Sequence, residues 1–182
     1  FDYNEGILVE GPNAQPSDPH YGANYWMDWE KEVHFELFDA EGNRQINQGA
    51  GVKVTGNYSR MSPLKSLALF ARSRYGNGSF NYKFFVDRSY DKFETLLLRN
   101  SGNDFGFSMI RDGLVSEMSK KLDLERLAYQ PAIIYLNGEY WGILNMRDKP
   151  NEHYFKNNYN IEKDELNLLE GNASIIHGST SE

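Results

Sequence analysis

Lys65 is the side chain whose place in the sequence most favours chemistry. It alternates with Leu67, Leu69 and Ala71, so a strand through these residues would carry a lysine on its apolar face. Such a lysine must meet an anion or reach the edge of the sheet, because its charge is costly to bury alone. One interpretation is a sheet lysine that holds a phosphate group, and the other is a structural lysine at the start of the strand.

The turn before Lys65 contains groups that suit a phosphate. Residues 55–63 read Thr-Gly-Asn-Tyr-Ser-Arg-Met-Ser-Pro, and the amides and hydroxyls of such a turn can face an anion. The glycine and lysine spacing of a Walker loop is absent. By itself the turn is weak evidence for a phosphate contact. It gains weight only together with the basic residues around it, such as Lys65.

Basic residues gather in the same part of the chain. Residues 51–90 contain seven lysines and arginines and a single acid, whereas residues 1–50 contain ten acids and two bases. Because the net charge is −7, this distribution argues against nonspecific nucleic-acid binding and favours a site for one compact anion. We expect Lys65, Arg60 and Arg72 to converge on one pocket beside the turn. The alternative is that these bases balance acidic strands of the same sheet.

Several other kinds of site are excluded or disfavoured. The chain has no cysteine, which excludes disulfides and thiolate zinc sites. Its four histidines lack the spacing of a zinc hydrolase, and no nucleophile elbow is present. The triplet at 104–106, Asp-Phe-Gly, matches the magnesium-binding triplet of kinases, but it precedes the long helix instead of following a catalytic loop. We interpret it as a polar turn.

A group of aromatic residues near the N-terminus has two interpretations. Tyr21, Tyr25, Trp26 and Trp29 lie within nine positions of one another. Such rings can stack on sugars, but they more often cover a sheet. Carbohydrate binding therefore remains an alternative function for this part of the chain.

The elements that position these residues are mostly strands, and the fold class that we predict is α+β with a mostly antiparallel sheet. Residues 11–25, rich in proline, glycine and small polar residues, are expected to form a loop. No apolar run reaches the roughly 20 residues of a membrane helix. The predicted strands cover residues 6–10, 33–37, 51–55, 64–71, 93–98, 133–136, 140–145 and 166–169.

One long helix is predicted at 107–122, because apolar residues recur there every three or four positions. We expect Asp104 or Ser108 to cap its start, and its apolar stripe to pack on the sheet. A tight hairpin is predicted at Asn137-Gly138, and a short helix at 151–158. The residues of the stripe are Phe107, Ile110, Leu114, Met118 and Leu122.

Four blocks of sequence, in a fixed order, carry a family resemblance. Residues 51–69 match the pattern G-[IV]-[RK]-x-x-G-x-x-[ST]-R followed by a P-x-K-S strand, and residues 97–112 contain Leu-Leu-Arg-Asn and Met-Ile-Arg-Asp. Residues 131–143 form the most characteristic block, and residues 151–169 follow it. In this order the blocks resemble the CotH family of atypical kinases, in the large form seen in secreted bacterial proteins. The resemblance covers roughly residues 49–169.

The resemblance implies a fold similar to the N-lobe of a protein kinase, which binds ATP with Mg or Mn and phosphorylates protein side chains. It implies that Lys65 touches phosphate, with Ser59 and Arg60 in the preceding turn. Arg111 and Asp112 match the pair on the helix that plays the part of the kinase C-helix.

By position, Met146 and the three residues after it stand where a kinase hinge contacts adenine. The family also implies a protein phosphoacceptor for the full-length parent, and an extracytoplasmic location, secreted or at the cell surface.

One departure from the family pattern limits the expected activity. The catalytic aspartate and the Asp-x-Asp metal ligands of this family follow the hinge. About 33 residues follow Lys149, and they contain Asp164 but no Asp-x-Asp. We therefore predict a nucleotide-cradling lobe without catalytic residues or metal ligands. In domain terms, 1–48 is an extension packed on the same sheet, 49–170 is the lobe, and 171–182 is a tail that we expect to be cut from a longer chain.

Three hypotheses follow. The first is the ATP-binding half of a CotH-type kinase. The second is a noncatalytic binding or structural domain of a secreted or cell-surface protein, with carbohydrate as one candidate partner. A hydrolase is a distant third. An Asp-x-Asp further along the gene would favour the first, and a native stop codon near residue 182 would favour the second.

Overall fold

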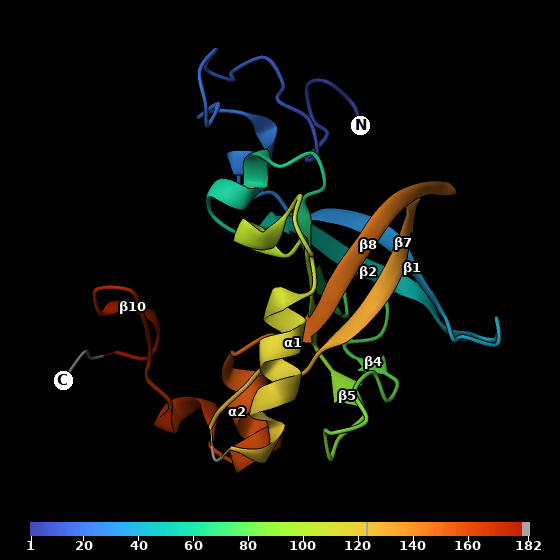
Figure 1. The fold of residues 1–182 in the computed structure, drawn as a ribbon, viewed down its shortest axis with the longest axis vertical. Coiled ribbons are helices and arrows are strands. Elements are labelled where there is room, and N and C mark those ends of the chain that lie inside the picture. Colours follow the sequence, from blue (N-terminus) through green and yellow to red (C-terminus); the bar gives the residue numbers. More distant parts are fainter. Residues whose placement is uncertain (123, 180–182) are drawn as a thin grey trace.

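A curled antiparallel sheet of six strands forms the centre of the computed structural model, which describes residues 1–122 and 124–179 (Figure 1). The α+β class and the antiparallel sheet are as predicted. In spatial order the strands are β1 (Lys31–Phe38), β2 (Arg44–Thr55), β3 (Ser66–Phe70), β6 (Thr95–Arg99), β8 (Glu139–Asp148) and β7 (Gln130–Leu136).

Smaller elements surround this sheet. Helices α1 (Arg111–Met118) and α2 (Glu152–Tyr159) lie near one end of the sheet, and the N-terminal segment lies at the other end (Figure 1). No helix in the part of the chain that the structure describes is long and apolar enough to cross a membrane. Two short strand pairs complete the fold: β4 (Phe80–Asn81) with β5 (Lys92–Phe93), and β9 (Leu168–Glu170) with β10 (Ser174–His177).

The hairpin and the second helix follow their local sequence signals. Asn137 and Gly138 both have positive φ, 52° and 83°, as the tight turn between β7 and β8 requires. Helix α2 begins after Asn151, whose side chain accepts a hydrogen bond from the backbone N–H of Tyr154. Both predictions are confirmed, since the turn and the cap depend on neighbouring residues only.

Two strand predictions need correction. β2 begins at Arg44 instead of residue 51, because the turn at 39–43 brings it back beside the whole length of β1. Its first half is polar and glycine-rich, so the hydrophobic pattern did not reveal it. The strand predicted at 6–10 is absent: this segment forms turns, with the Gly6 N–H bonded to the Asp2 carbonyl at 2.7 Å.

The two faces of the sheet differ in chemistry. One face, here named the core face, is defined by a row of buried apolar residues that lie side by side on four strands. The aromatic segment 80–93 packs into the core on this side, with Phe84 and Phe93 edge to face at 5.3 Å. The residues of the row are Val54, Leu67, Leu98 and Met146.

The opposite face, here named the α1 face, carries basic side chains beside small and apolar ones. Its defining row is the neighbouring one, which lies one residue later on β3 and β8 and one residue earlier on β2 and β6. Helix α1 packs against this face, where Asp112 forms salt bridges with Arg147 at 2.5 Å and with Arg99 at 3.0 Å. The residues of the row are Lys53, Ala68, Leu97 and Arg147.

The predicted packing of the long helix is wrong. The α-helix spans eight residues, and the side chains of the predicted stripe, from Phe107 to Met118, are between 52% and 78% exposed. The buried residues are Gly113 and Ser116. A Cβ atom on Gly113 would lie 2.4 Å from the Tyr129 ring, so the helix approaches the chain through its small residues. The apolar period therefore marks the face turned away from the sheet.

Candidate functional site

Lys65 immediately precedes β3, and its side chain is buried. Its Nζ donates hydrogen bonds to the carbonyls of Arg60 at 2.7 Å and Ser62 at 3.2 Å, and lies 3.9 Å from the centroid of the Tyr25 ring. Burial lowers the pKa of Lys65 to about 8, because it disfavours the charged form. Two carbonyls and an aromatic ring thus replace water around the ammonium group, as the structural interpretation of this lysine requires.

An open pocket of about 460 Å³ lies beside Lys65. The N-terminal segment contributes Glu10, Asp18 and His20 to its wall. His20 Nε2 lies 3.1 Å from an Asp18 oxygen and 4.0 Å from a Glu10 oxygen. A phosphate group here would meet one ammonium and two carboxylates, so the pocket fits a free phosphate poorly.

Ser59 and Arg60 lie close to Lys65, but their polar groups bind other parts of the chain. The Arg60 guanidinium donates to the Gly56 carbonyl at 2.6 Å and to the carbonyls of Tyr25 and Trp26 at 3.3 Å. The Ser59 carbonyl accepts a hydrogen bond from the Asn100 side chain at 3.3 Å. The turn is therefore tied to the N-terminal segment and to the end of β6.

Arg72 does not join this group, and the prediction that it converges with Lys65 is wrong. Its guanidinium stands 4.8 Å from the Phe70 ring and grips both carboxylate oxygens of Glu30 at 2.6 to 2.9 Å. Arg74 binds the same carboxylate at 2.5 Å. Lys65 and Arg72 are seven positions apart, an odd number, so a strand directs them to opposite faces.

The bases of residues 51–90 are in part neutralised by acids of the first fifty residues. Glu30 holds Arg72 and Arg74, and Asp28 lies 2.9 Å from Lys53. The hydrogen bond from Arg72 is the main cause that lowers the pKa of Glu30 from 4.5 to about 2. These three cations are thus balanced by acids, as the alternative expected, but the acids lie in the segment just before β1 and not in an acidic strand of the sheet.

The pair on the helix, Arg111 and Asp112, faces two different partners. Arg111 forms a salt bridge with Asp104 at 3.2 Å, and Asp104 also accepts a hydrogen bond from the Arg111 backbone N–H at 3.0 Å. The expected cap by Asp104 or Ser108 is wrong, because the helix begins at Arg111 with Ile110 at its N-cap position and no side-chain cap there, although Asp104 binds the first N–H of the helix. Hydrogen bonds, first of all from Ser108, lower the pKa of Asp104. This carboxylate is engaged within the protein, as a polar turn requires.

Arg147 was placed at the hinge position by the sequence interpretation, which missed its role as the partner of helix α1. It is 3% exposed, and burial lowers the pKa of its guanidinium. Besides the salt bridge to Asp112, it donates to the carbonyls of Ala128 at 2.7 Å and Leu127 at 3.0 Å. The signal was the alternation in β8, where Asn145 and Arg147 interrupt an apolar strand at every second position and so mark a polar face.

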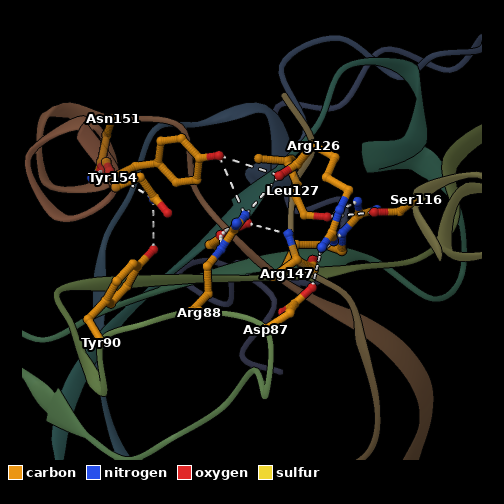
Figure 2. A network of polar contacts seen from close by, with 12 residues as sticks. Asp87, Arg88, Tyr90, Ser116, Arg126, Leu127, Arg147, Asn151 and Tyr154 are labelled. Atoms are coloured by element: carbon orange, nitrogen blue, oxygen red, sulfur yellow. Dashed lines mark hydrogen bonds and ion pairs between the residues drawn. The ribbon is translucent and has the colours of Figure 1, made fainter. Parts of the chain in front are cut away.

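The segment before β7 is held by a network of arginines (Figure 2). Arg88 donates to Asp148 at 2.7 Å and to the Arg126 carbonyl at 2.8 Å, and the Tyr154 hydroxyl donates to the same carbonyl at 3.4 Å. Ser116 of α1 donates to the Leu127 carbonyl at 2.6 Å. Both helices and the end of β8 are thereby linked to the segment that contains Arg126 and Leu127.

The end of β8 stands where a kinase hinge was expected. Met146 is buried on the core face beside Leu98, so a contact with adenine would have to come from the residues after it. Lys149 follows the strand on the α1 face, with its Nζ 5.4 Å from the Phe70 ring. Burial lowers the pKa of Lys149, Glu152 raises it, and the cations Lys53 and Arg72 lower it further.

The aromatic residues near the N-terminus do not form one platform. Tyr25 is buried beneath Lys65, and Trp26 lies 5.1 Å from Tyr21. Trp29 lies apart from these rings, and the Lys31 Nζ lies 5.3 Å from the centroid of its ring. The arrangement favours their role in covering the protein over a flat sugar-binding surface.

Among the residues that the structure describes, no group of three or more histidine or carboxylate side chains could hold a metal ion. A model of the family described as CotH kinase protein matches residues 52–182. None of the curated proteins matches the chain. The matched region runs from the middle of β2 through both helices and contains Lys65, Asp112, Arg147 and Lys149.

Proposed function

Because the chain belongs to the CotH kinase protein family, we propose that it forms the nucleotide-binding part of an atypical protein kinase. The family match over residues 52–182 is the observation that carries this proposal. The substrate that we propose to receive the phosphate is a protein side chain. The place of action that we propose is outside the cytoplasm, in a secreted or cell-surface protein.

The contacts between helix and sheet support the proposal. Protein kinases join a basic residue of the sheet to an acidic residue of the C-helix by an ion pair. Here α1 lies between β6 and β7 in the chain, and its Asp112 binds Arg147 and Arg99 on the sheet. A polar pair, and not an apolar stripe, therefore fixes the helix on the lobe.

The residues present suit binding better than phosphoryl transfer. Phosphoryl transfer depends on a positioned base and on metal ions that neutralise the developing charge. Residues after Lys149 contain no Asp-x-Asp, and the described part of the chain offers no cluster of metal ligands. We therefore propose that Mg or Mn enters as part of the ATP complex, and that this chain contributes cationic and backbone contacts to the nucleotide.

Calorimetric titration of the chain with ATP and magnesium tests this function. We expect saturable binding with a dissociation constant of roughly 0.1–1 mM, which is about −4 to −5.5 kcal/mol, because an open lobe buries little of the ligand. Lys65→Met tests the contact that the family resemblance implies, and Lys65→Arg serves as its charge-matched control. Absence of saturable binding at several times this concentration would refute the proposed function.

A further inference from the structure

The α1 face carries a group of cations around one aromatic ring. Arg72 and Lys149 both direct their charged heads at the ring of Phe70, at 4.8 and 5.4 Å from its centroid. Lys53, on the neighbouring strand β2, lies opposite Ala68. Ala68 is two residues before Phe70 in β3 and faces the same side of the sheet. Three basic side chains, one on β2 and one each just after β3 and β8, thus lie near one short stretch of the sheet.

Lys149 is the least compensated of these cations. Within residues 1–122 and 124–179 it forms no salt bridge at 4.0 Å or less, whereas Lys53 has Asp28 and Arg72 has Glu30. Asp28 is highly exposed, so water weakens its hold on Lys53. Glu152 and Asp28 favour the charged form of Lys149 from a greater distance. An anion that reached this place would find one unpaired and one weakly paired ammonium group.

The floor of this face is built from small, buried residues where β2 pairs with β3, and Ala68 is 3% exposed. Ala68 contributes only a methyl group, and Gly51 contributes no side chain. A Cβ atom on Gly51 would lie 2.5 Å from Glu30 Oε1, so the glycine is what allows a carboxylate to rest there. The Glu30 carboxylate is bound by Arg72 and Arg74 through both of its oxygens. It shows that this face accepts an oxyanion.

We propose that the nucleotide phosphates bind on the α1 face, between Lys53, Arg72 and Lys149, above the floor of Ala68 and Phe70. This inference rests on the proposed nucleotide-binding function. It places the phosphates on the face that also bears α1 and the Asp112–Arg147 pair. The site lies at the end of β8, where the residues at the hinge position stand. The Lys65 pocket lies on the other face, and its two carboxylates oppose a phosphate group.

The test is calorimetric titration of this chain with two probes, magnesium-ATP and inorganic tripolyphosphate, using substitutions at Lys149 and Lys53. We expect Lys149→Gln and Lys53→Gln to weaken the binding of both probes about ten-fold or more, because each removes a charge-assisted hydrogen bond. Lys149→Arg keeps the charge but changes the shape of the head group, so it should weaken binding less than Lys149→Gln does. Lys121→Gln removes an exposed lysine next to α1 and is the matched control, with no expected change. Thermal melting of each variant checks that it is folded.

The outcomes separate the inference from the proposed function. Unchanged binding of both probes by folded Lys149→Gln and Lys53→Gln variants overturns the inference. Loss of ATP binding in Lys65→Met alone overturns it too, while the proposed function stands. If tripolyphosphate binds through Lys149 but ATP binds no better than tripolyphosphate, the anion site stands and the nucleotide function fails.

Discussion

Glu30 offers the sharpest test of how the sheet is stabilised. The change from Glu30 to Gln removes the charge that Arg72 and Arg74 share, while keeping the size of the side chain. The pKa of Glu30 falls from 4.5 to about 2, and about 1.4 kcal/mol per unit sets an upper limit of roughly 3 kcal/mol on its contribution to stability at pH 7. The arginine side chains are 44% and 60% exposed, so water screens the interaction and we expect a loss of about 1–2 kcal/mol.

The assay is urea unfolding of the original chain and of Glu30→Gln between pH 2 and 7. Because the folded pKa lies below the unfolded value, the stabilisation is complete above pH 4.5 and disappears as the pH falls towards 2. Glu36→Gln is the matched control, since Glu36 pairs with Arg44 at 2.9 Å on the exposed part of the same sheet, and it should cost at most about 1 kcal/mol. Equal stability of Glu30→Gln and the original chain at pH 7 would refute the reasoning.

The same substitution also examines the anion site. Without its charge, Glu30 no longer competes for Arg72, and the α1 face gains one net positive charge. We therefore expect Glu30→Gln to bind tripolyphosphate several-fold more tightly at low salt than the original chain, roughly 3- to 10-fold. Weaker binding would mean that Glu30 positions Arg72 for the ligand instead of occupying it.

Three further predictions concern the helix and the activity. Gly113→Ala places a Cβ atom against the Tyr129 ring and should lower the free energy of unfolding by about 1–3 kcal/mol, whereas Leu114→Ala on the exposed side should change it by less than about 1 kcal/mol, both measured by urea unfolding. Asp112→Asn leaves the buried Arg147 without its carboxylate, and because Asp112 is 36% exposed it should cost about 1–3 kcal/mol in the same measurement; no measurable cost would show that the carbonyls alone satisfy the arginine. Incubation with radiolabelled ATP and magnesium or manganese should give no measurable phosphoryl transfer by this chain, and robust autophosphorylation would mean that the catalytic residues have been misplaced.

Local sequence signals predicted the parts of the fold that depend on neighbouring residues. The Asn137-Gly138 turn, the alternation of β1 and the cap at Asn151 each involve residues a few positions apart. The polar first half of β2 escaped prediction because its partner, β1, and not its own composition, makes it a strand. The buried face of helix α1 was mispredicted for the same reason. Gly113 lies against Tyr129, which is sixteen positions further along the chain.

The candidate site was predicted less well than the fold, because a sequence shows which residues are basic but not which acids they meet. Arg72 was grouped with Lys65 by its charge, and strand alternation places the two on opposite faces. The acid that binds Arg72 lies 42 positions away, in a segment of no obvious structure. The role of Arg147 was missed because a buried arginine is recognised by its partners, Asp112 and two carbonyls, which only the fold brings together.

The acids that neutralise Lys53, Arg72 and Arg74 come from outside the region that matches the family. Asp28 and Glu30 precede residue 52, and β1 pairs with β2 along its length. The part of the chain before residue 52 therefore does two things at once: β1 completes the sheet, and the acids just before β1 set how many positive charges the α1 face presents to a ligand. If phosphates bind there, the affinity for them is set by the competition between this segment and the ligand for the same arginine and lysine side chains.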